Sequence, residues 1–153
     1  MGYVDRVLQP SEQVIHRSLL HWLVYGRAVL LLAAAVAVAL AALQAPDDWR
    51  GVLDDVAMAL LGLAVLLALA AAIHRASTEL VVTNQRIIFK RGVISRHTVE
   101  MNRSKIESVD VDQSLLGRML NYGTVVVRGT GGSLEPLANI ESPLELRSHI
   151  TVA

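Results

Sequence analysis

Cysteine is absent from this 153-residue chain, and aromatic residues and net charge are scarce. Without cysteine the chain has no disulfide, no thiolate zinc site and no cysteine nucleophile. The 14 Lys and Arg residues balance the 14 Asp and Glu residues, which excludes a broadly basic nucleic-acid binder and an acidic disordered chain. Aromatic residues make up 4 % of a chain that is 53 % hydrophobic, so Ala, Leu and Val must supply the apolar excess. Where that excess lies is therefore the informative question.

The apolar excess is concentrated in two uninterrupted blocks. Residues 28–43 are all apolar, residues 22–26 extend this block with Arg27 near its end, and residues 56–73 form the second block. A helix as long as the second block spans about 27 Å, close to the hydrocarbon thickness of a bilayer. Neither block has a polar face. We therefore predict transmembrane helices at about residues 22–43 and 56–73, rather than a soluble helix pair or a cleaved signal peptide.

The polar connector between the blocks is expected to form a tight turn, so that the helices are antiparallel neighbours. Asp54 and Asp55 should lie at the N-terminus of the second helix, where carboxylates interact favourably with free N–H groups. Stripes of small residues, which permit close helix packing, are Ala33, Ala37 and Ala41 in the first block and Ala64, Ala68 and Ala72 in the second.

Basic residues flank the predicted hairpin on the side of the chain ends. The connector contains Arg50 alone, whereas seven cations lie before the hairpin, near its start or soon after it: Arg6, Arg17, Arg27, Arg75, Arg86, Lys90 and Arg91. The positive-inside rule therefore predicts a multi-pass protein with both termini in the cytoplasm.

After Thr78, short β-branched segments separated by turn residues replace the long apolar runs. The candidate strands are residues 79–83, 87–91, 93–101, 105–112, 123–129 and 134–140. Residues 114–122 suit a short turn or one-turn helix, and residues 143–152 suit a C-terminal helix. The pattern predicts an α+β protein: a two-helix hairpin followed by a six- to seven-stranded antiparallel β-barrel or sandwich with a C-terminal helix.

Short motifs follow one another in a recognisable order along the β region. They are Thr83, Arg86-Ile87-Ile88, Gly92, Ile106, Val109, Gln113-Ser114, Leu116-Gly117-Arg118, Tyr122-Gly123-Thr124 and the Gly-rich turn at 129–132. Residues 8–12 (LQPSE) add an N-terminal motif, with Ser11 where Gly is usual. This order resembles the bacterial pleckstrin-homology (PH) domain family, in small membrane proteins that have two transmembrane helices and a cytosolic PH-like domain.

The resemblance implies a multi-pass protein of the bacterial inner (plasma) membrane, with a seven-stranded PH-like barrel in the cytosol. It implies no particular ligand. Together with the composition, it divides the chain into an N-terminal cytosolic segment (1–21), a transmembrane helical hairpin (22–75) and a bacterial PH-like domain (78–153).

An enzyme constellation is not evident in the sequence. No histidine has a partner at a recognised metal-ligand spacing; the five are His16, His21, His74, His97 and His149. The carboxylates of Asp110 and Asp112 share one strand face, where solvated surface is the simpler interpretation. The Gly-rich turn joins two strands and does not lead into a helix, which argues against a phosphate loop. We therefore expect a protein that is not an enzyme and has no metal and no cofactor.

The zero net charge conceals a dipolar β region. Residues 86–105 carry a net charge of +5, with Glu100 as the one carboxylate, and residues 106–145 carry −4. Residues 74–78 reach at most about 17 Å, so the first β-hairpin should lie near the anionic leaflet, where each cation contributes about 1 kcal/mol of attraction. The candidate lipid- or partner-binding residues are Arg86, Lys90, Arg91, Arg96, Arg103 and Lys105.

These cations allow a second interpretation, in which they only orient the domain or are ordinary solvated charges. A further set is expected to be structural: Thr83, Asn84, Gly92, Gly117, Arg118, Tyr122 and Gly123. Within this set, Arg118 should hydrogen-bond neighbouring strand carbonyls, with a partner contact as the alternative.

Three classes of function stay open. The first is a membrane-anchored binding or scaffold module that recruits a protein partner or self-assembles into a homo-oligomer. The second is recognition of anionic lipid headgroups through the basic first hairpin. The third is an accessory subunit of a membrane transport or stress complex. The helices carry no charge near mid-membrane and so offer no ion pathway of their own. The expected partners are the lipid bilayer and a protein, and not a nucleic acid.

Overall fold

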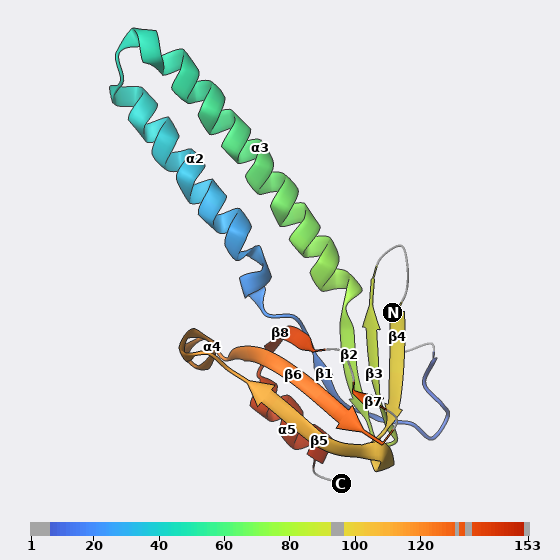
Figure 1. Cartoon of the computed structure of the whole chain (residues 1–153). Coiled ribbons are helices and arrows are strands. Elements are labelled where there is room, and N and C mark those ends of the chain that lie inside the picture. The colour runs from blue at the N-terminus through green and yellow to red at the C-terminus, as the bar shows by residue number, and fades with distance from the viewer. Residues whose placement is uncertain (1–6, 93–96, 131, 134–135, 152–153) are drawn as a thin grey trace. The chain divides into compact units, whose positions relative to one another are not determined.

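The chain forms two compact units, a helical hairpin and a β domain (Figure 1). The computed structural model describes residues 7–92, 97–130, 132–133 and 136–151. The hairpin is Trp22–His74, and the β domain combines the chain before it with the chain after it, Met1–His21 with Arg75–Ala153. The β domain has two antiparallel sheets and a C-terminal helix, which confirms the predicted α+β class.

The helical unit is a pair of antiparallel helices joined by a short link (Figure 1). A 3-10 turn, η1 (Trp22–Tyr25), leads into α2 (Gly26–Gln44), and α3 covers Asp47–Ser77. The segments Trp22–Gln44 and α3 are both long and apolar enough to cross a membrane. Only 17 % and 11 % of their most apolar stretches are buried, whereas a core helix of a soluble protein would be mostly covered.

The link between the two helices is shorter than predicted. Helix α3 begins at Asp47, directly after Pro46, whose carbonyl accepts hydrogen bonds from the first turn. The acidic residues of that first turn are Asp47 and Asp48, so the prediction that Asp54 and Asp55 begin the helix is wrong. Carboxylates in the first turn favour the N-terminus of a helix, and here Asp47 and Asp48 take that place.

Alanines form the contact between the helices, but not all of those predicted. The buried residues are Ala28, Ala35 and Ala42 on α2, and Ala57 and Ala64 on α3. Their spacing of seven residues is the repeat at which two helices keep one face in contact. The predicted stripe of Ala33, Ala37 and Ala41 is exposed instead.

The first sheet has the order β1-β2-β3-β4 and is antiparallel throughout. Its strands are β1 (Val14–Ser18), β2 (Glu79–Thr83), β3 (Arg86–Arg91) and β4 (His97–Asn102). We expected residues 1–21 to be a segment apart from the β domain. Instead, β1 is an edge strand of this sheet, with Ser18 opposite Leu80 of β2. Residues 93–96 of the predicted third strand lie outside the described residues.

The second sheet has β6 at its centre. Strands β5 (Ile106–Asp112) and β7 (Gly132–Ser133) flank β6 (Tyr122–Gly129), and β8 (Leu137–Glu141) also pairs with β6. A short helix, α4 (Leu115–Met119), connects β5 to β6, and α5 (Pro143–Thr151) follows β8. The predicted one-turn helix and C-terminal helix are therefore both present.

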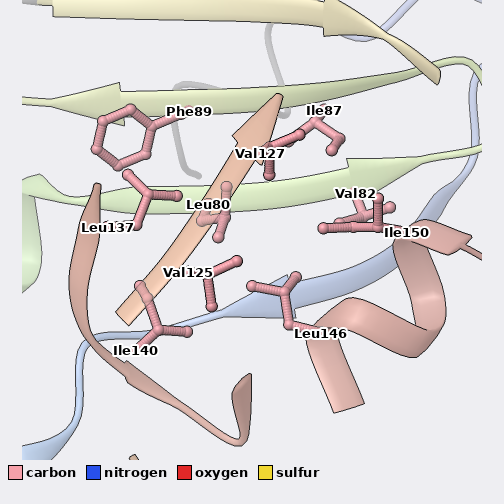
Figure 2. Close-up of a cluster of buried hydrophobic side chains, with 10 residues drawn as sticks. All are labelled: Leu80, Val82, Ile87, Phe89, Val125, Val127, Leu137, Ile140, Leu146 and Ile150. Atoms are coloured by element: carbon pink, nitrogen blue, oxygen red, sulfur yellow. The ribbon is translucent and has the colours of Figure 1, made fainter. Parts of the chain in front are cut away.

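The main core lies between the two sheets and α5 (Figure 2). Strands β2, β3, β6 and β8 and helix α5 each contribute two of its buried side chains, and Phe89 is the one aromatic residue among them. The buried members are Leu80, Val82, Ile87, Phe89, Val125, Val127, Leu137, Ile140, Leu146 and Ile150. Helix α5 contributes Leu146 and Ile150, one turn apart, and so covers the core with a single face.

The N-terminal segment covers the other face of β2 and β3. Val81 and Ile88 point away from the main core and form a second buried cluster with Leu8 and Val14. Strand β2 is consequently buried on both faces, which explains its continuous run of apolar residues. Residues that precede the helical hairpin are thus part of the fold of the domain that follows it.

Substituting Leu146→Ala should lower the free energy of unfolding of the β domain by about 2–5 kcal/mol, because it removes a fully buried side chain and leaves a cavity. Urea unfolding of the detergent-solubilised chain, followed by circular dichroism, measures the change. The matched control is Leu144→Ala, two residues away on α5 and 57 % exposed, which should change stability little. Equal effects of the two substitutions would contradict the packing described for α5.

Candidate functional site

The six basic residues predicted to bind a lipid or a partner do not form one cluster. Arg86 begins β3 and pairs with Asn102, the last residue of β4. Lys90 lies toward the other end of β3, opposite Glu79, the first residue of β2. Because a strand rises about 3.3 Å per residue, roughly 13 Å separates Arg86 from Lys90. The cations therefore divide between the two ends of the β2–β3 hairpin.

The remaining candidates follow the same division. Arg103 and Lys105 come directly after β4 and so lie at the end of the sheet that holds Arg86. Arg91 lies beside Lys90 at the other end, opposite His97. Arg96, the sixth candidate, lies outside the described residues.

Arg86 links the N-terminal segment to the β2–β3 hairpin through hydrogen bonds and an ion pair. Its Nε and Nη2 donate to the two carboxylate oxygens of Glu12 at 2.9 and 2.8 Å, and its Nη1 donates to Glu100 at 2.7 Å. Nη2 also donates to the Val7 carbonyl at 3.1 Å. The side chain of Glu12 is 0 % exposed and that of Arg86 is 14 % exposed. These bonds commit Arg86 to the fold rather than to a lipid headgroup.

Glu12 is held in its charged form inside this network. Thr83 Oγ1 donates to Glu12 at 2.7 Å, and the Gln9 N–H donates at 3.1 Å. Burial would raise the pKa of Glu12, but the hydrogen bonds from Arg86, Gln9 and Thr83 outweigh burial and lower the pKa. The hydrogen bond to Glu12 in turn raises the pKa of Arg86. The pair therefore stays ionised at neutral pH.

Asn84, expected to be a turn residue, also holds the N-terminal segment. Its Oδ1 accepts from the Gln13 N–H at 3.0 Å, and its own N–H donates to the Gln13 carbonyl at 3.1 Å. Its Nδ2 donates to the Ser11 carbonyl at 3.3 Å. The β2–β3 turn thus pairs with the chain before β1 as a strand would.

Arg103 hydrogen-bonds the last carbonyl groups of α5. Its Nη2 donates to the carbonyls of His149 and Ile150, at 3.1 Å each. Carbonyls in the last turn of a helix have no partner within the helix, and a cation there also meets the negative end of the helix dipole. Arg103 is therefore a capping residue. Lys105, close by in the chain, has an exposed side chain.

A groove of about 630 Å³ lies between β5 and α5. Arg103 and Arg147 line it together with Glu107 and Asp110, so charges of both signs surround the same space. This mixture favours no single class of charged ligand.

Lys90 and Arg91 are the described candidates whose position suits an anionic surface. Arg91 is exposed and Lys90 half-buried, and Gly92 follows at a φ of 106°, a conformation that favours glycine. The end of β3 that holds them lies beside the first residue of β2, and α3 ends at Ser77, two positions before it. They therefore lie at the end of the sheet where the chain arrives from the apolar helix.

Hydrogen bonds hold helix α4 at its base. Ser114 Oγ accepts from the Gly117 N–H at 3.0 Å, and Gln113 Nε2 donates to the Tyr122 carbonyl at 3.0 Å. A Cβ at Gly117 would come 2.7 Å from the Tyr122 carbonyl oxygen, and one at Gly123 would come 2.8 Å from a backbone oxygen of β5. Both glycines therefore permit close approaches of the backbone, as expected of structural residues.

The outer side of α4 is an exposed apolar patch, which we call the α4 surface. It consists of four residues with large exposed fractions: Leu115 (80 %), Leu116 (63 %), Met119 (81 %) and Leu120 (41 %). Arg118 lies among them and is exposed. Within the described part of the chain its side chain makes none of the predicted hydrogen bonds to strand carbonyls, and Gln113 makes that contact instead.

The α4 surface adjoins the point where the chain leaves the β domain for the first apolar helix. The ring of His21 stacks on Tyr122 at 5.2 Å between centroids, and Leu20 bridges to Ile140 of β8. Tyr122 follows the last residue of the α4 surface by two positions, and Trp22, the next residue after His21, begins the apolar segment. The exposed patch therefore lies near the residues of the β domain that surround His21, its last residue before the hairpin.

Three potential metal ligands that sequence spacing did not connect also meet in the β domain. His16 of β1 lies against Glu145 and His149 of α5. The i, i+4 spacing of Glu145 and His149 was visible in the sequence as one face of a helix, but nothing there indicated that His16 would join them.

Comparison with known proteins places most of the chain in a family. The sequence matches the family described as "Bacterial PH domain" over residues 20–152, most of the chain. No curated protein matches the chain, and no solved structure does.

Substituting Glu12→Gln should lower the free energy of unfolding by about 3–5 kcal/mol, the range found when one partner of a buried ion pair is removed. The matched control is Asp110→Asn in the Arg128–Asp110 pair, whose side chains are 60 % and 48 % exposed; it should cost at most about 1 kcal/mol. Urea unfolding at neutral pH measures both changes.

The pH dependence of the difference in stability between the wild type and Glu12→Gln tests whether Glu12 is ionised. Because its pKa is lowered in the fold, its contribution is complete above the unfolded pKa of about 4.3 and disappears as the pH falls through the folded pKa. The gap between the wild type and Glu12→Gln should therefore shrink below about pH 4. A gap that stays constant with pH would contradict an ionised Glu12.

Proposed function

The chain belongs to the bacterial PH domain family, and we propose that it is a non-enzymatic, membrane-anchored binding module at the cytoplasmic face of the bacterial inner membrane. In this proposal the helical hairpin crosses the bilayer twice, and the β domain recruits a protein partner beside the membrane. The observation that carries the proposal is the α4 surface, an apolar patch that the fold leaves uncovered.

Anchoring is supported by the exposure of the helical hairpin and by the distribution of cations. Most of the apolar side chains of α2 and α3 lack a protein partner in the fold, and a bilayer is the environment that would cover them. Arg50 is the one cation in or near the link between the helices, whereas Arg17, Arg27 and Arg75 lie toward the ends of the hairpin. This asymmetry favours a cytoplasmic β domain.

Recruitment of a partner is supported by the chemistry of the α4 surface. Exposed Leu and Met side chains lose contact with water only when a second surface covers them, and contiguous apolar patches of this kind mark interaction sites. Arg118 stands among them as a donor without a carboxylate in the described fold. The complementary partner surface is therefore an apolar groove bordered by Asp or Glu. A second copy of this chain is the alternative occupant that the experiment below distinguishes.

A photo-crosslinking amino acid placed at Met119 should give one discrete protein adduct in native membranes, because this side chain is 81 % exposed at the centre of the proposed contact. The adduct should weaken at least tenfold when Arg118→Glu is added, since that change opposes the proposed carboxylate. Immunoblotting measures the yield and the adduct mass. A mass of twice the chain identifies self-assembly, and any other discrete mass identifies a different protein.

The matched control carries the same amino acid at Ser108, an exposed position on β5 away from α4. It should give no discrete adduct. Absence of protein adducts at Met119, or equal adducts at Met119 and Ser108, would contradict recruitment through the α4 surface while leaving membrane anchoring unaffected.

A second candidate function, recognition of anionic lipid, is favoured by the position of Lys90 and Arg91. These cations lie at the end of the sheet where the chain arrives from α3. An anionic leaflet attracts each nearby Lys or Arg by about 1 kcal/mol. The contribution of Arg86 and Arg103 to such binding is not proposed, since both are engaged within the fold.

The full chain should unfold at a higher urea concentration in nanodiscs of anionic lipid than in zwitterionic nanodiscs. The double substitution Lys90→Glu and Arg91→Glu should remove most of that difference. The expected loss is about 2 kcal/mol, because each of the two cations contributes about 1 kcal/mol of attraction to the anionic leaflet. Lys105→Glu, at the other end of the sheet, is the matched control and should leave the difference nearly unchanged. Equal effects of the two variants would contradict headgroup recognition by this end of the hairpin.

A further inference from the structure

We propose that His16, Glu145 and His149 form a binding site for a divalent transition-metal ion of the Zn²⁺ class, which joins the first strand of the β domain to its last helix. This inference rests on the β domain alone and is independent of the proposed membrane and partner functions. It departs from the expectation, based on sequence spacing, that the chain has no metal site.

The three side chains converge from two elements that are far apart in the sequence. His16 lies on β1, while Glu145 and His149 are one turn apart on α5 and share one face. The rings of His16 and His149 are stacked, with centroids 4.6 Å apart and planes 22° apart. His149 Nε2 lies 3.8 Å from Glu145 Oε1. One potential ligand atom from each residue lies within 4.8 Å of the other two.

These distances are close to those of a tetrahedral metal site. Zn²⁺ binds imidazole nitrogen and carboxylate oxygen at about 2.0–2.2 Å, which places ligand atoms about 3.3 Å apart. Rotation of the Glu145 and His149 side chains would have to close the remaining gap, and neither side chain is fully buried. Two imidazoles and a carboxylate provide three ligands and leave a fourth position for water.

The donor set selects the class of metal. Imidazole nitrogen is a preferred ligand of Zn²⁺, Co²⁺, Ni²⁺ and Cu²⁺, whereas Mg²⁺ and Ca²⁺ prefer sites made of oxygen. With two nitrogens and one oxygen donor, the site suits the first group. Zn²⁺ is therefore the probe of choice, and Co²⁺ is its spectroscopic substitute.

The arrangement is more than a surface ion pair on α5. An exposed Glu–His pair one turn apart contributes little by itself, but here the fold brings a second imidazole against it. A metal ion bound at the nitrogen edges of the two rings would join β1 to α5 through shared coordination.

The experiment uses the full chain in detergent, purified through a tag without histidine and freed of metal with a chelator. Calorimetric titration with Zn²⁺ should give one ion per chain at micromolar or tighter affinity. His16→Gln and Glu145→Gln should each weaken binding at least tenfold. The matched control is His97→Gln, at an exposed position on β4, which should bind as the wild type does.

Titration with Co²⁺ supplies a readout of coordination itself, through visible absorption bands that His16→Gln should abolish. Circular dichroism of the metal-free variants checks folding, and the exposed Glu145 provides a substitution that leaves the packing intact. The proposal is overturned if Zn²⁺ binds no tighter than millimolar, or if Glu145→Gln retains wild-type affinity. Loss of binding in His97→Gln as large as in His16→Gln would also overturn it.

Discussion

The antiparallel pairing of β1 with β2 is the constraint on which the organisation of the chain depends. Strand β1 ends at Ser18, β2 begins at Glu79, and Ser18 lies opposite Leu80. The whole helical hairpin is therefore the connection of one β-hairpin, and it must leave and re-enter the sheet at the same end. Any membrane that these helices enter must be crossed an even number of times. The domain and both ends of the hairpin then belong to the same side of that membrane.

Because this connection is so long, the position of β1 depends on contacts made by the residues just before the strand. The cost of closing a loop rises only slowly with its length, but β1 is a short edge strand and needs further attachment. The ion pair of Glu12 with Arg86 and the paired backbone of Gln13 with Asn84 provide it. A buried ion pair contributes little net stability compared with apolar packing, but a buried charge that loses its partner is strongly destabilising. We interpret this pair as fixing the register of the first strand.

Features that depend on local sequence patterns could be predicted from the sequence. Contacts between segments that lie far apart in the chain could not. The apolar blocks, the alternating strands and α5 follow from periodicity within short windows. Strand β1 has five residues and a partner more than sixty positions away, so no local pattern reveals it. For the same reason Arg86 was counted as a free cation, because Glu12, its partner, is 74 positions distant. His16 and His149 meet in the same way.

The central claim is that the hairpin crosses the membrane and returns, leaving its tip outside and the β domain in the cytoplasm. Because the chain has no cysteine, single cysteines can be introduced without background, as Asp48→Cys at the tip and Ser148→Cys on α5, both at exposed positions. The direct measurement is labelling with a membrane-impermeant maleimide in spheroplasts. The account predicts that Asp48→Cys reacts in intact spheroplasts and that Ser148→Cys reacts only after permeabilisation. Reaction of both variants in intact spheroplasts, or of neither, would contradict it.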